Sequence, residues 1–279
     1  MNGILILNKP KGLSSNTACR KVGRILGEKK VGHLGTLDPM AEGVLPVSLG
    51  KCTKLFDFYL QKEKEYVADF SFGYETDTLD ADGVVIKTAS KIPTESEIEK
   101  NLSSFLGEQS QMPPKYSAKK VNGKRAYDLA RMNQDFELKP KTIKIFEFSL
   151  LEKVDECTFR FKIACSSGTY IRSICRDLAE SLNTCATMTK LVRTKCAKFC
   201  LENAVCFDEI DETKVISLDE IFNDYDKISI NENQLNTFLN SSRLDLKLDN
   251  GICCLKFNGD IISFGEINNN VFVSKIRFV

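Results

Sequence analysis

The alternation of apolar and polar positions predicts a strand followed by a helix at the start of the chain. Residues 3–8 form a short apolar run, which is typical of a buried strand. Residues 15–26 carry apolar side chains at helical spacing, after serines that can cap a helix and before Gly27, which can end one. Helical spacing returns at 51–60, so we expect a second helix whose packing face comprises Leu55, Phe56 and Tyr59.

The period changes to two after residue 62, which is the spacing of a strand with one buried face. Between this point and residue 182, strand-like and helix-like patterns alternate, separated by polar loops. The expected elements are a strand at 63–72, a helix at 94–105, two strands at 141–151 and 157–165 that form a hairpin, and a helix at 170–182. The inward side chains of the second hairpin strand are Phe159, Phe161 and Ile163, whereas Arg160 and Lys162 face outward.

Beyond residue 200 the chain changes character. Residues 201–225 hold eight acids against one lysine, which suits a linker or a helix turned away from a polyanion. Short apolar runs broken by Asn-Gly and Asn-Asn turns then predict a small β domain. We therefore place a domain boundary near residue 225, with one domain at 1–225 and a smaller one at 226–279.

The net charge of +1 hides an uneven distribution. Residues 1–60 carry nine basic against four acidic side chains, and residues 113–200 carry eighteen against nine. The intervening 61–112 and the final 201–279 are acidic, with five against eleven and seven against fourteen. Two basic segments that converge on one face would form the footprint of a nucleic-acid binder, but a solvated surface of mixed charge explains the counts equally well.

Cysteine usage and hydropathy bear on location and metal binding. Eleven cysteines is an odd number in a long chain, and most lie in apolar or strand-like contexts, so we expect reduced core thiols. Cys196 and Cys200 have no matching second pair, and no zinc site is expected. There is no run of 18 apolar residues, and the N-terminal segment lacks the features of a secretory signal. We expect a cytoplasmic protein without a membrane contact.

The segment Val31–Pro46 contains the only histidine, His33, together with three glycines and two prolines. This composition predicts an ordered loop. Within it, Asp38 precedes Pro39, which restricts Asp38 to extended backbone and so holds its carboxylate at a fixed angle. Asp-Pro is also a common start of a turn, and on the residues alone the turn is favoured over a catalytic role.

The string Gly32-His33-Leu34-Gly35-Thr36-Leu37-Asp38-Pro39, with Ala41 and Gly43, resembles the catalytic motif of the TruB family of tRNA pseudouridine synthases. Further strings resemble the family's other motifs in the same order over roughly residues 3–200. They are Lys9-Pro10-Lys11-Gly12-Leu13-Ser14-Ser15, Thr76-Asp77-Thr78-Leu79-Asp80-Ala81-Asp82-Gly83, Gly168-Thr169-Tyr170-Ile171-Arg172 and Lys190-Leu191-Val192-Arg193-Thr194. Leu34 and Glu42 depart from the family pattern, which often has small hydroxyl residues there, so the loop packing is expected to differ locally.

A segment at about 108–140 resembles the RNA-clasping insertion of the same family. Between Lys115 and Arg131 it places six basic residues beside Tyr116 and Tyr127. Cationic and aromatic side chains together neutralise phosphates and stack on bases. A solvated helix is the alternative, although such a helix needs no Pro-Pro-Lys-Tyr-Ser-Ala ahead of it.

The resemblance implies an α+β fold around a mixed, mostly antiparallel sheet with flanking helices and a central cleft. It implies conversion of uridine 55 in the T loop of tRNA to pseudouridine by a monomer that uses no cofactor or metal. The partner would be the T-arm stem-loop. Residues 226–279 stand where family members carry a PUA domain, which they match weakly.

The resemblance also implies roles for individual residues. Asp38 would be the essential carboxylate, and Arg172 the partner that keeps it ionised. Tyr66 would stack on the flipped base and manage its C5 proton, although a core tyrosine is an equal alternative. Leu191 would close the other side of the base, and Tyr170 and Asp80 would hydrogen-bond the backbone and the arginine. His33 would occupy the space that the nucleotide leaves, and Lys9, Lys119 and Lys120 would contact phosphates.

Two other classes of protein were weighed against this interpretation. Basic and aromatic patches would equally suit a non-catalytic RNA-binding protein or a tRNA-folding chaperone, but such a protein has no reason to bury the Asp38 anion in an RNA cleft. A zinc base deaminase also flips its target base, but the His-x-Glu and Cys-x-x-Cys ligand pattern that it needs is missing from the chain.

Overall fold

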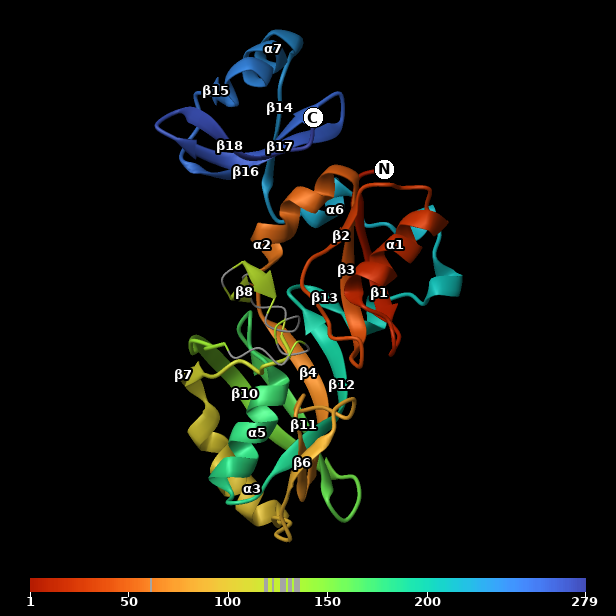
Figure 1. The fold of residues 1–279 in the computed structure, drawn as a ribbon. Coiled ribbons are helices and arrows are strands. Elements are labelled where there is room, and N and C mark those ends of the chain that lie inside the picture. The colour runs from red at the N-terminus through yellow and green to blue at the C-terminus, as the bar shows by residue number, and fades with distance from the viewer. Residues whose placement is uncertain (61, 118–119, 122, 126–128, 130–131, 133–135) are drawn as a thin grey trace.

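The computed structural model describes residues 1–60, 62–117, 120–121, 123–125, 129, 132 and 136–279. Among these residues a nine-stranded sheet runs in the order β1-β3-β12-β4-β11-β10-β7, with β2 and β13 at its side. A five-stranded sheet, β14-β16-β17-β18-β15, lies at the other end of the molecule (Figure 1). Most strand pairs are antiparallel, and the parallel ones are β3 with β12 and β14 with β16. The α+β fold with a mostly antiparallel sheet is therefore confirmed.

The N-terminal part of the large sheet begins as the sequence predicts. Strand β1 (Gly3–Lys9) pairs with β3 (Glu42–Leu49) over seven residues. Helix α1 (Ser15–Ile25) begins after Ser14, whose side chain accepts a hydrogen bond from the backbone of Thr17 at 3.1 Å. Its buried face packs against the strands.

The prediction of a loop throughout Val31–Pro46 was wrong at both ends. Residues Val31–His33 form β2, and Glu42 begins β3, so only 34–41 are irregular. Seven of the eight β3 residues are buried, including Pro46. Burial of this apolar run and its long pairing with β1 outweigh the missing proline donor. Gly43 is required there because, at φ +97°, its Cα lies against the Arg193 backbone with no room for a side chain.

Strand β12 (Ala186–Cys196) joins the two halves of the large sheet. It runs antiparallel to β4 (Lys64–Phe72) on one side and parallel to β3 on the other. This strand was not predicted from the sequence, although residues 190–194 within it resemble a family motif. Beyond β4 the sheet continues with β11 (Thr158–Cys165), β10 (Lys141–Lys153) and β7 (Gly107–Gln111). The predicted hairpin of β10 and β11 is confirmed.

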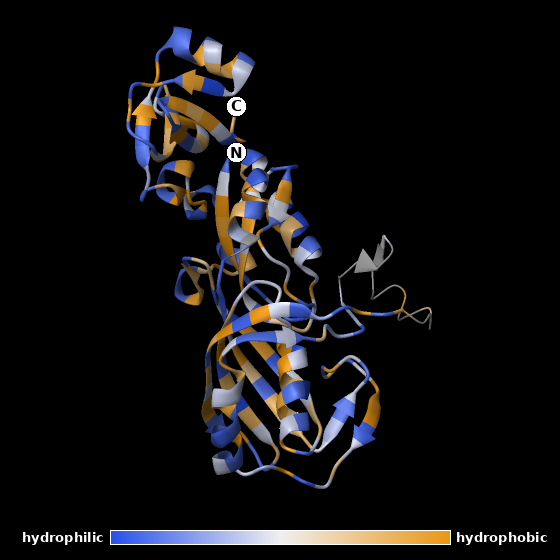
Figure 2. Ribbon diagram, turned by 90° about the vertical axis from the view of Figure 1, so that its left-hand side faces the viewer, coloured by the Kyte–Doolittle hydropathy of each residue, from blue (hydrophilic) through white to orange (hydrophobic). Residues whose placement is uncertain are grey.

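Two helices cover one face of this half of the sheet, α3 (Glu95–Leu102) and α5 (Ile171–Ser181) (Figure 1). Thr94 caps α3 as predicted, in a capping box with Glu97. Between helices and sheet lies an apolar core in which Phe70 and Phe161 contact each other at 4.8 Å between ring centroids. Figure 2 shows apolar and polar residues alternating along the strands, as expected for a sheet that has one face against a core.

The other helices and strands that the structure describes before residue 201 are short. They are η1 (Gly50–Leu55), α2 (Phe56–Leu60), β5 (Tyr74–Thr76), β6 (Val85–Thr88), η2 (Ser103–Phe105), β8 (Lys120–Val121), β9 (Lys124–Arg125) and β13 (Phe199–Cys200). Leu55 and Tyr59 are buried as expected, but Phe56 is 37% exposed. The chain is a 3₁₀ helix up to Leu55, so the predicted α-helical face does not continue through Phe56.

Residues 201–225 form short helical turns that follow the edge strand β1. They are η3 (Leu201–Asn203), η4 (Phe207–Glu209), η5 (Glu212–Lys214) and α6 (Leu218–Ile221). Backbone hydrogen bonds from Ile4 to Ile216 and from Asn8 to Val205 tie this segment to the sheet. It is therefore part of the packed structure, and more than the linker that its acidic composition suggested.

The C-terminal sheet has five strands, of which the last three fall on the apolar runs that predicted a small β domain, whereas the two short strands at 226–229 and 243–245 were not predicted. It contains β14 (Asp226–Ser229), β15 (Arg243–Asp245), β16 (Gly251–Phe257), β17 (Asp260–Asn268) and β18 (Val271–Arg277), with α7 (Glu232–Ser241) packed on it. Phe222 stacks on Phe264 at 4.6 Å between centroids, and the Lys54 amine donates a hydrogen bond to the Arg277 carbonyl at 2.6 Å. Among the described residues, no helix is long and apolar enough to cross a membrane.

Candidate active site

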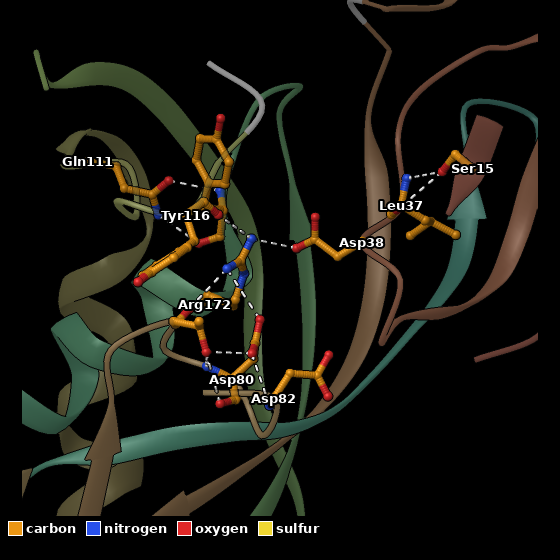
Figure 3. A network of polar contacts seen from close by, with 10 residues as sticks. Ser15, Leu37, Asp38, Asp80, Asp82, Gln111, Tyr116 and Arg172 are labelled. Carbon is orange, nitrogen blue, oxygen red and sulfur yellow. Dashed lines mark hydrogen bonds and ion pairs between the residues drawn. The ribbon is translucent and has the colours of Figure 1, made fainter. Parts of the chain in front are cut away.

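The irregular segment 34–41, which joins β2 to β3, carries Asp38. The backbone of Asp38 begins a turn, with the Ala41 N–H donating to the Asp38 carbonyl at 3.1 Å. The turn expected from Asp-Pro is thus present, and the carboxylate projects away from it (Figure 3). Ser15, at the start of α1, fixes the preceding residue, because its hydroxyl contacts both the N–H and the carbonyl of Leu37 at 2.8 Å.

Arg172 lies beside Asp38 and is almost completely buried. One guanidinium nitrogen is 2.8 Å from the Asp38 carboxylate, and the other is 3.2 Å from that of Asp80 (Figure 3). The same group donates to the backbone carbonyls of Thr78 and Tyr116 at 2.9 and 3.1 Å. The side chain of Arg172 is 6% exposed, whereas that of Asp38 is 38% exposed. Arg172, in the first turn of α5, therefore fixes the accessible Asp38 carboxylate through an ion pair.

Asp80 completes the support of Arg172. Burial raises the pKa of its carboxyl, while hydrogen bonding from Thr78 and the charge of Arg172 lower it in part. The Thr78 hydroxyl lies 2.7 Å from one Asp80 oxygen, and the Asp82 N–H donates to the same oxygen at 3.2 Å. Asp80 is therefore a buried acceptor that fixes Arg172, as the resemblance implied for hydrogen bonding to the arginine.

A cavity of about 240 Å³ opens beside Asp38. It is smaller than the roughly 300–1,000 Å³ typical of pockets for drug-sized ligands, so it suits a group of about the size of one nucleotide base. Its lining brings together Asp38, Tyr66, Tyr170, Arg172 and Leu191 from four separate parts of the chain. Five of the residues proposed from sequence thus converge on one cavity.

The two tyrosines of the cavity are held differently. Tyr66 is 7% exposed, and burial raises the pKa of its phenol, so the phenol stays protonated at neutral pH. Burial also raises the pKa of Tyr170. The backbone of Tyr170 is fixed by Gln111, whose side-chain amide accepts from the Tyr170 N–H at 2.8 Å and donates to the Tyr170 carbonyl at 3.1 Å.

His33 is not among the residues that line this cavity. His33 ends β2, and burial lowers the pKa of its imidazole, which favours the neutral ring. Its Nδ1 is buried and finds no hydrogen-bond partner within the described part of the chain. Lys120 belongs to β8, and Lys119 lies outside the described residues.

The expectation that Lys9 contacts phosphate is not met, because Lys9 is fully buried. Its amine donates to the carbonyls of Pro10 and Leu13 at 2.8 Å and to that of Pro39 at 3.4 Å. Burial lowers the pKa of this amine to about 8. Lys9 therefore ties the end of β1 to the segment that carries Asp38. The sequence placed it in a turn and gave no sign that nearby carbonyls enclose its amine.

Sequence reasoning missed two basic residues of the cavity wall, Lys64 and Arg193. Both are buried, Arg193 completely. Period two along β12 places Arg193 on the same face as Leu191, which was the available signal. Leu34, one of the departures from the family pattern, is also fully buried, in a core cluster with Val44 and Cys52.

Groups that could bind a metal ion or form a disulfide bear on the chemistry available to the protein. No group of three or more His, Cys, Asp or Glu side chains that could hold a metal ion occurs within the described ranges. The eleven cysteines are free thiols, and eight of them are buried. The predicted buried thiols are therefore confirmed for most of the cysteines, with Cys206 exposed.

Comparison with known proteins identifies the family. Residues 23–171 match the model of the TruB family pseudouridylate synthase N-terminal domain. The chain is 41% identical over 277 residues to tRNA pseudouridine synthase B of Mycoplasma mobile, covering 99% of this chain and 94% of that protein. It is 42% identical over 259 residues to the protein of the same name from Oceanobacillus iheyensis, covering 88% and 85%. The chain belongs to the TruB family of pseudouridylate synthases.

Solved structures with lower sequence identity share the fold. A Cbf5-Nop10-Gar1 complex matches with a TM-score of 0.69 and 22% identity, covering 99% of this chain and 85% of that chain. An H/ACA RNP bound to a substrate RNA containing 2'-deoxyuridine matches with a TM-score of 0.70 and 20% identity, again covering 99% and 85%. These matches span both sheets of the present structure.

Proposed function

We propose that this protein converts uridine 55 in the T loop of tRNA to pseudouridine, with Asp38 as the essential carboxylate. The observation that carries the proposal is the accessible Asp38 carboxylate, 2.8 Å from buried Arg172, at a cavity of nucleobase size. The family and the names of its relatives support tRNA as the substrate. We assign residues 1–225 to a catalytic domain, about 108–140 to an RNA clasp and 226–279 to a small β domain of a cytoplasmic monomer.

The proposed reaction is an isomerisation. The C1'–N1 bond of the nucleotide breaks, the uracil rotates, and a C1'–C5 bond forms. The proton leaves C5, and N1 gains one, so no electrons are exchanged with another molecule. A carboxylate beside the ribose serves this chemistry either as a nucleophile or as a base for the 2' proton. The Asp38 carboxylate is accessible and is held by Arg172, as a nucleophile or a base would need to be.

The other cavity residues have distinct proposed roles. Arg172 orients the Asp38 carboxylate and is itself fixed by Asp80. Tyr66 stacks on the flipped base and relays the C5 proton as a neutral phenol, because its pKa is raised. Leu191 closes the other side of the base, while Tyr170 contacts the RNA from the N-cap position of α5. His33, neutral because its pKa is lowered, occupies the space that the nucleotide vacates.

Tritium release tests this proposal directly. A tRNA transcript labelled with tritium at C5 of uracil should release its label on incubation with the protein, because C5 loses its proton only when the new bond forms. A transcript with cytidine at position 55 and labelled uridines elsewhere is the control and should release none. Tight binding of the first transcript without release would instead favour the RNA-binding protein or tRNA-folding chaperone.

Replacing Lys119, Lys120 and Lys124 with alanine should weaken tRNA binding and flatten its dependence on salt. Each lost phosphate contact lowers the slope of log affinity against log salt by about 0.7 to 0.9. The measurement is a salt titration of transcript binding. The matched control replaces Lys87, Lys100 and Lys153, three exposed lysines on β6, α3 and β10, with the same change of charge. Equal slopes for the two triple variants would show that the insertion does not contact the phosphates of the RNA.

Turnover should continue in EDTA with a reducing agent present. The proposed isomerisation changes no oxidation state, so a carboxylate and an ordered cavity suffice. Because magnesium folds tRNA, the measurement should use a T-arm hairpin that folds without it. Loss of turnover on that hairpin in EDTA, with recovery on adding zinc, would contradict the prediction and reopen the deaminase-like alternative.

A further inference from the structure

Arg193 is a fully buried cation on the central strand β12. A buried guanidinium is costly unless its charge and its donors are satisfied. Within the described part of the chain, Arg193 forms no ion pair with a carboxylate. Three of its hydrogen bonds run to backbone carbonyl oxygens, and the position of these carbonyls in the fold explains why the guanidinium is buried.

All three carbonyls belong to the segment that leads into and out of the Asp38 loop. The Arg193 Nε donates to the carbonyl of Val44 at 2.8 Å. The two terminal nitrogens donate to the carbonyls of Gly35 and Thr36 at 3.1 and 3.3 Å. A planar guanidinium has five donors in a rigid fork, so one side chain can fix several peptide groups at once. Arg193 thus fixes the backbone two and three residues before Asp38.

Arg193 also faces Tyr66. The two residues are directly opposite each other in the antiparallel pairing of β12 with β4, and side chains at such positions lie on the same face of a sheet. Both line the cavity. The positive charge of Arg193 lowers the Tyr66 pKa in part, against the rise that burial causes. One side chain therefore contacts the element that carries Asp38 and the element that carries Tyr66.

The charged side chains of the cavity wall also indicate that Arg193 does more than neutralise Asp38. Lys64, Arg172 and Arg193 supply three cations to the lining, whereas Asp38 is its one carboxylate among the described residues. Arg172 is paired with that carboxylate. Asp38 therefore does not need the charge of Arg193 for neutralisation, and the guanidinium of Arg193 has a different role.

We propose that Arg193 is a positioning residue, which fixes the Asp38 loop and the Tyr66 side chain relative to each other across the cavity. This inference rests on the proposed function, since it concerns the rate of that reaction. Misplacing a reacting group by about 1 Å can lower a rate by about 100-fold. Loss of the fork should therefore act on kcat, while the RNA surface is left in place.

The test compares Arg193→Lys with the wild type in tritium release from the labelled transcript. Lysine keeps the positive charge but gathers its donors on one atom, so it cannot hold the Gly35, Thr36 and Val44 carbonyls together. We expect kcat to fall by about 100-fold and KM and RNA affinity to change by less than about threefold. A wild-type kcat, or a loss that appears only in KM, would overturn the proposal.

The matched control is Arg160→Lys on the neighbouring strand β11. Arg160 also uses its fork, on the Asp69 carboxylate at 2.7 and 2.9 Å, but it is absent from the cavity lining. Its replacement should lower stability and leave kcat unchanged. Equal loss of kcat in both variants would mean that Arg193 acts only through general stability, which also overturns the proposal.

A second variant covers the case in which Arg193→Lys does not fold. Arg193→Gln removes the charge that must be buried and keeps a planar donor for one carbonyl. It should fold, bind the transcript and show the same loss of kcat, and a wild-type kcat would overturn the proposal. An inactive wild type would contradict the proposed function instead, so the two failures are distinguishable.

Discussion

Asp38→Asn should abolish turnover while the affinity for tRNA stays the same or increases. The substitution keeps the shape of the side chain and its contact with Arg172, but it removes the nucleophile or base that the reaction needs. It also removes one negative charge from the edge of an RNA cleft, which reduces repulsion of phosphates. The expected result is therefore a separation of catalysis from binding.

Two measurements on one transcript establish that separation. Tritium release reports turnover, and binding at fixed salt reports affinity. Asp57→Asn is the matched control, because it removes the same charge from an exposed position on α2, outside the cavity lining. Normal tritium release by Asp38→Asn would refute the assignment of the essential carboxylate. Lost affinity in Asp38→Asn alone would show that the residue binds RNA rather than acting on it.

Arg172→Met should destabilise the protein and stop turnover together. Methionine fills much of the space but leaves the Asp80 carboxylate, whose side chain is 8% exposed, without its cation. Breaking a buried ion pair in this way costs about 3 kcal/mol. The contact with Asp38 adds little to this figure, because the Asp38 side chain is 38% exposed and screened by water. Turnover should stop because the Asp38 carboxylate loses its fixed orientation.

A double variant separates the two effects of this change. Adding Asp80→Asn to Arg172→Met removes the unpaired carboxylate, so urea unfolding should show that most of the lost stability returns. Tritium release should remain absent, since nothing then orients Asp38. Full stability of Arg172→Met, or recovery of turnover in the double variant, would contradict the network seen in Figure 3.

Local patterns predicted much of the fold because they act within a single element. The inward Phe159, Phe161 and Ile163 are fully buried, as their period-two spacing required. Thr94 and Ser14 cap the helices that their side chains and spacing indicated. In these cases the residue type and its neighbours along the chain determine the structure, so no tertiary information was needed.

Predictions from the sequence failed where contacts between distant parts of the chain determine the structure. Strand β12 mixes apolar, hydroxyl and basic residues without a regular period of two, and its identity depends on β3 and β4 lying on either side. Lys9 is buried because the carbonyls of Leu13 and Pro39 surround its amine, and Pro39 comes from another part of the chain.

The candidate site likewise contains residues that could be proposed from the sequence and residues that could not. Asp38, Tyr66 and Arg172 were proposed through resemblance, and the structure brings them together at one cavity. Arg193 was missed because its role depends on carbonyls that no side-chain pattern reveals. Backbone groups leave no signature in the sequence, so residues that act on them are the hardest to predict.

Locating pseudouridine in a treated transcript tests the central claim most directly. An unmodified tRNA transcript is incubated with the protein, and each pseudouridine is mapped by chemical labelling and primer extension. We predict one new pseudouridine, at position 55, with the wild type and none with Asp38→Asn. Pseudouridine at another position only, its absence with the wild type, or its presence at position 55 with Asp38→Asn would contradict the proposed function.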